Sequence, residues 1–484
     1  MGIAGILVGL ALLIGLAYRG WSVLLLAPVA ALVAALFAGD PLLAHWTQTF
    51  MGSAAGFVAQ FFPIFLLGAL FGKLMDDSGS VRSIARYIGD KLGARRAILA
   101  VVIAGALVTY GGVSLFVAFF VIVPMAQALF REAGIPHRLM PAAIVLGTST
   151  FTMSALPGTP AIQNAIPMPF FGTTPFAAPG LGIVASAIMI AFGLWWLAWR
   201  EGAARRAGEG YGGQAPGAPA EAAEDPLVRE RATVAREFDP AELQHGKRGE
   251  REPSIVVAAL PLVVVVLVNL LMSLVVLPRM DVDFLADERW GPTTIASVGG
   301  VWSVVVALVV AIVVLVAMNR ARLPDLRASM DAGANASVLP VLSVASLVGF
   351  GAVIAALPAF ELVRDWVLSI EGGPLVSLAV STNVLAALTG SASGGLTIAL
   401  DALGATYVQL AADLGIDPAL MHRVAVIGAG TLDSLPHNGA VVTLLAVCGS
   451  THGKSYFDIV MVGIVGAIVA LVAVIVLGTM FGSF

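Results

Sequence analysis

Two apolar stretches of the chain are interrupted by the runs Thr389-Gly390-Ser391-Ala392-Ser393-Gly394-Gly395 and Thr109-Tyr110-Gly111-Gly112-Val113-Ser114. Small and polar residues in such stretches predict broken helices, because non-helical backbone survives at membrane depth only where protein or a water-filled cavity satisfies its polar groups. Residues 115–129 and 396–412, which follow the runs, are predicted to be helical. Each break would therefore point a helix N-terminus with free N–H groups into a cavity, where an anion fits.

The overall composition places these breaks in a membrane protein. Of the 484 residues, 59% are hydrophobic and 12% are charged, and the mean hydropathy is +0.95. A helix needs about 20 apolar residues to span the hydrocarbon core, and stretches of this kind allow roughly ten or more crossings. We expect an all-α polytopic membrane protein whose partners are the lipid bilayer and a transported ion, with no nucleic acid, cofactor or metal. The single cysteine, Cys448, excludes an internal disulfide.

A hydrophilic segment divides the chain into two halves. Residues 200–253 hold 20 of the 56 charged side chains and are predicted to be a cytoplasmic linker. Before it, we expect first-half scaffold helices in residues 1–96, ending in an amphipathic surface helix over 76–96, and a transport unit with broken helices in residues 97–199. Residues 254–373 and 374–484 are predicted to be the corresponding scaffold and transport unit of the second half.

The distribution of basic residues predicts an orientation. Arg and Lys gather in residues 82–96 and 320–327, whereas residues 39–51 contain neither. Because basic loops stay in the cytoplasm, a first helix over residues 3–17 would run from outside to inside. A helix over residues 255–276 would run the opposite way.

The two halves also match in sequence. At an offset of 281 residues, Gly134-Ile135 corresponds to Gly415-Ile416, and after a two-residue slip Leu156-Pro157 corresponds to Leu435-Pro436. Since the corresponding helices would have opposite orientations, we predict two inverted-topology repeats with broken, re-entrant helices. This pattern is typical of alternating-access transporters.

A second pair of polar interruptions lies in residues 147–160 and 428–439. Pro157 and Pro436 open these helices further because proline lacks a backbone donor, and Gln163-Asn164 offers neutral hydrogen-bonding groups nearby. We predict that the four breaks form one polar site near the midplane, although glycines in them are also explained by close helix packing. The predicted substrate-binding residues are Gly111, Gly112, Ser114, Thr148, Ser149, Thr150, Ser391, Ser393, Gly394, Gly395 and Asn438.

Three titratable residues are candidates for proton coupling, namely Asp433, His437 and Asp401, because ionisable groups inside a membrane are costly and are commonly functional. We interpret His422-Arg423 and His137-Arg138 as interfacial anchors placed just before their helices. No Arg or Lys is expected in the middle of a span. That absence favours a substrate with one carboxylate, which helix ends and neutral donors can bind.

Five motifs carry a family resemblance, namely residues 65–75, Asp77-Ser78-Gly79, Gly390-Ser391-Ala392, Gly428-Ala429-Gly430-Thr431 and Ser434-Leu435-Pro436-His437-Asn438. At these motifs the sequence resembles the gluconate permease (GntP) family of the ion transporter superfamily. The resemblance implies a proton symporter of the bacterial cytoplasmic (inner) membrane that imports sugar acids or short hydroxy acids, and a homodimer with a moving transport unit and a scaffold. The Ser434-to-Asn438 segment and the long linker differ from gluconate-type members and are similar to permeases for 3-hydroxybutyrate.

Two other classes of function compete with this interpretation. A sodium-coupled carrier of citrate or another dicarboxylate is one, because Ser381-Thr382-Asn383 offers neutral oxygens for Na⁺. A membrane-embedded enzyme is the other, but the chain has no His-Glu-x-x-His or Gly-x-Ser-x-Gly motif. A channel is disfavoured by the paired broken helices.

Overall fold

The computed structural model describes residues 2–17, 19, 21–212, 252–291, 293–436 and 438–484, and these residues form helices and no strands. Eight helices in this described part are long and apolar enough to cross a membrane, and three shorter apolar helices accompany them. The roughly ten or more crossings predicted from the sequence are therefore reached in the described part only when the shorter apolar helices are counted. For the described residues the prediction of an all-α protein is confirmed, and the eight long apolar helices agree with a polytopic membrane protein.

The first half begins with a helical hairpin, continues with one long span, and then turns into a surface helix. The span passes through α3, η1 and α4 without a break and ends at Asp77. The next helix, α5, meets the following segment at a bend of 98°. These elements are α1 (Gly2–Ala17), α2 (Val23–Ala38), α3 (Leu42–Ala44), η1 (His45–Phe50), α4 (Met51–Asp77), α5 (Ser80–Leu92) and η2 (Ala94–Arg96).

The surface helix is shorter than the predicted range of residues 76–96. It begins at Ser80, after Gly79 has adopted a left-handed φ of 75°. Asp77 instead belongs to the buried end of α4, where its carboxylate accepts hydrogen bonds from Lys73 Nζ at 3.0 Å and from Ser329 Oγ at 2.7 Å. A buried charge needs such partners. Asp77 thus pairs with Lys73 of its own helix and ties the end of α4 to Ser329 of the second half.

The rest of the first half consists of helices that are broken twice. The first break separates α6 from α7, and the second is followed by three short helices before the last long helix. The elements are α6 (Ala97–Tyr110), α7 (Leu115–Ala133), η3 (His137–Leu139), α8 (Met140–Thr148), α9 (Phe151–Ser154), α10 (Ile162–Ala165), α11 (Pro167–Phe171) and α12 (Pro179–Arg206).

The second half repeats this order of a hairpin, a long span, a short helix, two broken helices and a long final helix. The part predicted to be its scaffold consists of α16 (Ile255–Leu271), η4 (Met272–Val276), η5 (Leu277–Arg279), η6 (Asp283–Ala286), η7 (Glu288–Trp290), α17 (Ile295–Asn319), η8 (Arg320–Arg322), α18 (Leu326–Ala336), α19 (Val338–Ala356) and α20 (Phe360–Leu368). Its broken part consists of α21 (Gly373–Thr389), α22 (Ala392–Leu414), α23 (Pro418–Thr431), α24 (Gly439–Val447), α25 (His452–Ile459), η9 (Val460–Val465) and α26 (Gly466–Phe481).

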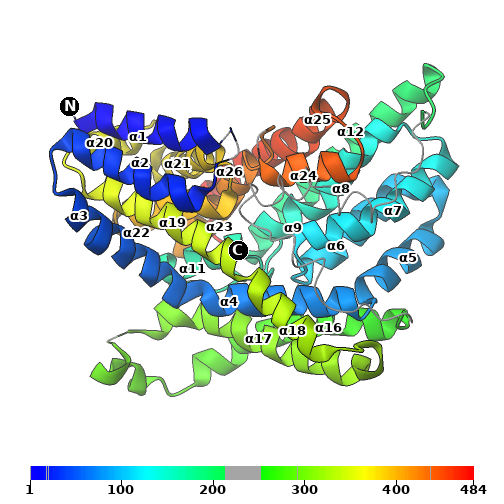
Figure 1. Cartoon of the computed structure of the whole chain (residues 1–484), viewed down its shortest axis with the longest axis horizontal. Coiled ribbons are helices and arrows are strands. Elements are labelled where there is room, and N and C mark those ends of the chain that lie inside the picture. Colours follow the sequence, from blue (N-terminus) through cyan, green and yellow to red (C-terminus); the bar gives the residue numbers. More distant parts are fainter. Residues whose placement is uncertain (1, 18, 20, 213–251, 292, 437) are drawn as a thin grey trace.

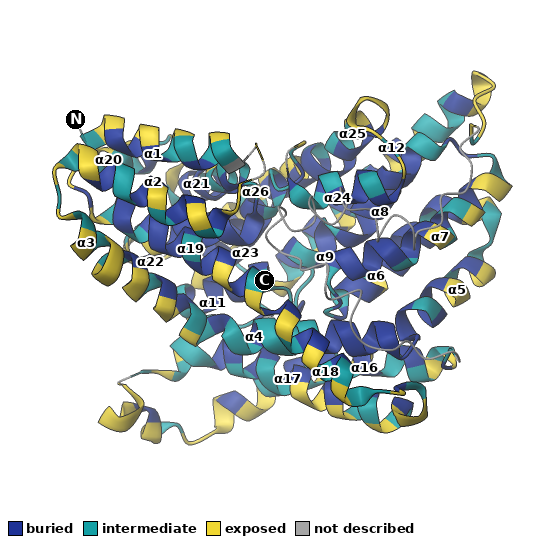
Figure 2. Ribbon diagram, in the orientation of Figure 1, coloured by how far each residue is buried: buried dark blue, intermediate teal, exposed yellow. Residues whose placement is uncertain are grey.

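The long helix α4 connects the two ends of the molecule. In Figure 1, the α1–α2 hairpin and the α5–α7 region lie at opposite ends of the long axis, and α4 runs between them. It packs against α17, α18 and α19 of the second half. Figure 2 shows exposed outer faces on α1, α2 and α17 and mostly buried turns in α6, α8 and α23. Apolar side chains on the outer faces, such as Leu7 and Val313, are 59% and 62% exposed, as expected for surfaces that face lipid.

The described ends of the linker are held by basic residues of the first half. Arg138 Nε donates to Glu209 Oε1 at 2.7 Å, and this hydrogen bond lowers the pKa of the Glu209 carboxyl. Arg86 Nη2 donates to Glu252 Oε1 at 2.9 Å. The predicted linker begins as the last turns of α12, while residues 213–251 lie outside the described residues.

Candidate functional site

A cavity of about 160 Å³ lies where three of the four breaks meet the scaffold. The first break, the second break with the short helix after it, and the third break each contribute side chains. The scaffold contributes the middle of α4 and the junction of α18 with α19. The residues used below are Gly112, Ser114, Met153, Pro160, Gln163 and Ser393 from the breaks, and Phe65, Gly68, Ser337 and Pro340 from the scaffold.

The first break is a turn shaped by two glycines with different roles. Gly112 has a φ of 97°, which favours glycine, and a Cβ there would lie 3.0 Å from Pro160 Cγ. A Cβ on Gly111 would lie 2.2 Å from Leu262 Cδ2, so Gly111 permits close packing of α6 on α16. The Tyr110 hydroxyl donates to Pro157 O at 2.8 Å. The first and second breaks are therefore joined beside the cavity.

The third break ends α21 at Gly390, which has a left-handed φ of 64°, and starts α22 at Ala392. The sequence predicted free N–H groups at this helix start. In the structure, Asp433 Oδ1 accepts the Ala392 N–H at 2.9 Å, and Ser391 Oγ accepts the Gly394 N–H at 3.2 Å. An anion does occupy the N-terminus of α22, but it is a carboxylate of the protein.

The fourth break is connected to the third by Asn438. Its Nδ2 donates to Asp433 Oδ1 at 2.8 Å and to Gly390 O at 3.0 Å, while its Oδ1 accepts the Ala440 N–H at 2.7 Å. Asn438 therefore caps α24 and holds Asp433 in place. His437, the other proton-coupling candidate of this segment, lies outside the described residues.

Several predicted binding residues serve helix packing instead of the cavity. A Cβ on Gly395 would lie 2.2 Å from Ala386 N, and a Cβ on Gly394 would lie 2.4 Å from Leu347 Cδ1. Close helix packing, the alternative left open above, therefore accounts for both glycines. Ser393 is the residue of this run that lines the cavity.

The predicted hydroxyls of the second break are bonded to their own helix. Thr148 Oγ1 donates to Ile144 O and Thr150 Oγ1 to Leu146 O, each at 2.8 Å, and Ser149 Oγ lies 3.0 Å from Thr148 Oγ1. These three residues are not part of the described cavity lining. Asp401 is also outside this lining, because it lies on the exposed side of α22.

His422 and Arg423 are not interfacial anchors, because both side chains are fully buried. Arg423 Nη2 donates to Ala177 O at 2.7 Å, and its Nη1 donates to Ser154 O and to Asn164 Oδ1, each at 3.4 Å. The structure therefore buries a basic pair near the start of α23, a helix that is not one of the eight long apolar helices of the described residues. The guanidinium thus hydrogen-bonds to the second break and to the loop before α12, and it does not line the cavity.

The sequence contains a helix-start pattern that bears on the position of His422 and Arg423. Asp417 accepts the Ala419 N–H at 2.8 Å as an N-cap, and Pro418 occupies the first helical turn. An Asp-Pro pair is a common helix start. Applied at residue 417, this rule places residues 422 and 423 more than one turn inside α23.

Gln163 and the junction of α18 with α19 complete the cavity but were not among the predicted binding residues. The Gln163 side chain is 4% exposed, and its Oε1 has no hydrogen-bond partner in the described part of the chain. Ser337 and Pro340 approach from the scaffold. Their contribution depends on how the scaffold packs against the breaks, for which the sequence gives no local signal.

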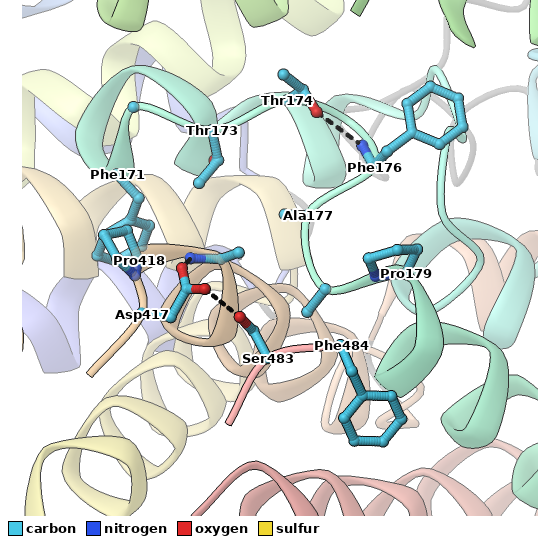
Figure 3. A pocket seen from close by; sticks show the side chains of 13 residues that line it. Phe171, Thr173, Thr174, Phe176, Ala177, Pro179, Asp417, Pro418, Ser483 and Phe484 are labelled. Carbon is cyan, nitrogen blue, oxygen red and sulfur yellow. Dashed lines mark hydrogen bonds between the residues drawn. The ribbon is translucent and has the colours of Figure 1, made fainter. Parts of the chain in front are cut away.

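A second cavity of about 440 Å³ lies on the outer side of the loop that precedes α12. Figure 3 shows Thr173, Thr174 and Ala177 on one side of it and the hydrogen-bonded pair of Asp417 and Ser483 on the other. Thr173 Oγ1 lies 2.6 Å from His422 Nδ1, and Ala177 O accepts from Arg423. The loop therefore separates this cavity from the buried basic pair.

Comparisons with known proteins agree on one class of protein. Residues 1–170 match the model of the GntP family permeases. The chain is 42% identical over 480 residues to an uncharacterized transporter, YxjC, of Bacillus subtilis (strain 168), a match that covers 97% of this chain and 98% of that protein. It is 33% identical over 164 residues to a high-affinity gluconate transporter of Escherichia coli (strain K12), covering 33% of this chain and 35% of that protein.

Proposed function

Because this chain belongs to the GntP family of permeases and is a membrane transporter, we propose that it is a secondary active transporter that imports a small hydroxy monocarboxylate with a proton. The cavity that the breaks of both halves share with the scaffold carries this proposal. A site at such a junction can be exposed to either side when one part moves against the other. The bacterial cytoplasmic membrane is the expected location, and the homodimer implied by the family resemblance stays a prediction.

The lining of the cavity supports a small substrate with a single carboxylate. Its polar side chains are neutral, including Ser114, Gln163 and Ser393, and no Lys or Arg belongs to the described lining. The volume of about 160 Å³ suits a short acid better than an extended dicarboxylate. Hydroxyl and amide donors are sufficient partners for one carboxylate.

The position of Asp433 supports a coupling mechanism. As a carboxylate it binds the N-terminus of α22, where the partial positive charge of the helix favours an anion. Protonation would weaken this interaction and free the helix end for the substrate carboxylate, so that proton and substrate bind together. From α25, the titratable groups facing this segment are His452, whose Nε2 lies 2.7 Å from Pro436 O, and Tyr456, whose hydroxyl donates to Ser434 O at 3.2 Å.

The common element order of the two halves supports the proposed inverted repeats. Both described ends of the linker contact basic residues of the first half, through Arg138 and Arg86. Under the positive-inside rule these contacts favour a cytoplasmic linker. This arrangement supports the proposal of alternating access by two oppositely oriented halves.

The sodium-coupled dicarboxylate carrier receives less support. Ser381 Oγ and Thr382 Oγ1 each donate to Leu378 O, and Asn383 Nδ2 donates to Ala379 O. Donation leaves the side-chain oxygens able to bind a cation, but none of these side chains belongs to the described lining of the cavity between the breaks.

The decisive experiment is uptake by purified protein in proteoliposomes. Labelled 3-hydroxybutyrate, gluconate and citrate are each offered under an imposed proton gradient and, separately, under a sodium gradient. We expect proton-driven uptake of 3-hydroxybutyrate or gluconate. Uptake of citrate alone, driven by sodium alone, would contradict both the proposed substrate class and the proposed coupling ion.

A further inference from the structure

We propose that Gln163 recognises the substrate hydroxyl and thereby makes the carrier selective for hydroxy acids over unsubstituted short-chain acids. This inference rests on the proposed function and adds the residue that sets its specificity.

Gln163 is the member of the cavity lining with an unmet hydrogen-bonding need. Its side chain is 4% exposed, and no described residue contacts its Oε1 by a hydrogen bond. Buried polar atoms are nearly always paired, and leaving one unpaired is costly. A ligand with an O–H group can supply the missing donor, because an amide oxygen only accepts.

The neighbouring residue fixes Gln163 in place. Asn164 Nδ2 donates to Thr159 O at 3.1 Å and to Pro175 O at 3.0 Å, while its Oδ1 accepts from His422 Nε2 at 3.2 Å. Arg423 Nη1 donates to the same Oδ1 at 3.4 Å. With Asn164 bonded on every side, the short helix α10 is held rigidly, and Gln163 is presented to the cavity in advance of binding.

The other polar groups of the cavity complement this acceptor. Ser114 and Ser393 bring hydroxyls from the first and third breaks to the same space, and a hydroxyl can donate to a carboxylate. Ser393 Oγ lies 3.2 Å from Ser391 Oγ, and it would turn its proton from this neighbour to the substrate. A hydroxy acid can then satisfy Gln163 Oε1 with its hydroxyl while its carboxylate accepts from the serines. A plain fatty acid of the same length leaves Gln163 Oε1 without a donor.

A competition experiment in proteoliposomes tests this role. Uptake of labelled 3-hydroxybutyrate is inhibited with unlabelled 3-hydroxybutyrate or with butyrate, and the ratio of the two inhibition constants measures hydroxyl selectivity. We expect the wild-type protein to prefer the hydroxy acid, and we expect Gln163→Met, which keeps the length but removes the amide, to lower that ratio about 5-fold or more.

Thr443→Val is a matched control. Thr443 Oγ1 is likewise buried and unpaired among the described residues, but it lies on α24 and is not part of the cavity lining. This variant should keep the wild-type ratio. If it lowers the ratio as strongly as Gln163→Met does, selectivity does not depend on Gln163 and the inference is overturned.

Gln163→Asn keeps the amide but shortens the side chain by one methylene group, and it replaces Gln163→Met as the test if the methionine variant does not fold. It should also lower the ratio of the two inhibition constants. A folded Gln163→Met or Gln163→Asn protein with the wild-type ratio would overturn the proposed role of Gln163. If the wild-type protein transports no hydroxy acid, the proposed function fails and this inference fails with it. If the wild-type protein discriminates and the variants discriminate equally, only the role of Gln163 is wrong.

Discussion

Three consecutive residues of the third break, between α21 and α22, have different neighbours. Ser393 lines the cavity, whereas a side chain on Gly394 would meet Leu347 and one on Gly395 would meet the backbone of α21. Since Ser393 is 1% exposed, a larger side chain there has space only inside the cavity.

We therefore expect Ser393→Leu to abolish uptake without reducing membrane expression, because the added carbon atoms fill a cavity of about 160 Å³. Uptake and the amount of protein in the membrane are measured together. Ser369→Leu is the control, since Ser369 is exposed at the end of α20. Wild-type uptake by the Ser393→Leu protein would show that this cavity is not the substrate site.

Asp433→Asn tests the coupling residue with little change of shape. The amide oxygen can still accept the Ala392 N–H, so the third and fourth breaks stay connected, but the negative charge that responds to protonation is lost. We expect uptake that no longer rises with an inward proton gradient. The measurement is the uptake rate at a series of imposed gradients, and an unchanged dependence would exclude Asp433 as the coupling group.

At the scale of elements, the sequence predicted where helices break but not what each break contacts. Runs of small residues placed the start of α7 at Leu115 and located the break between α21 and α22 correctly. The roles of Gly111 and Gly395 depend on Leu262 and Ala386, residues that meet them only in the packed structure. The burial of Arg423 follows from a local pattern instead, because the Asp417-Pro418 pair starts α23 early enough to place residue 423 within the helix.

The close contact of α21 with α22 leads to a prediction about stability. Gly395→Ala would place a Cβ 2.2 Å from Ala386 N, which forces the two helices apart at a cost of about 1–3 kcal/mol. Gly56→Ala is the control, because Gly56 lies in α4 with nothing within 4 Å of an added Cβ. Thermal unfolding in detergent should show a lower midpoint for Gly395→Ala and an equal or higher one for Gly56→Ala.

At the scale of the whole molecule, side-chain hydrogen bonds and ion pairs join the two halves at two places. Lys73, Asp77 and Ser329 join α4 to α18, and Arg138 and Asp458 join η3 to α25. The cavity lies between the broken helices and the scaffold. Any movement that opens it to one side must therefore displace the broken helices relative to the scaffold, and this displacement can be followed chemically.

A single introduced cysteine can report this movement, because the native Cys448 is 1% exposed. In Ser114→Cys the thiol lies on the cavity wall. A membrane-impermeant thiol reagent is applied to vesicles of either orientation, with the wild-type protein as the unlabelled control. Because each molecule opens to one side at a time, alternating access predicts that substrate and a proton gradient change the modification rates from the two sides several-fold in opposite directions. Rates that rise or fall together on both sides would instead indicate a continuous pore, the channel that the paired broken helices argue against.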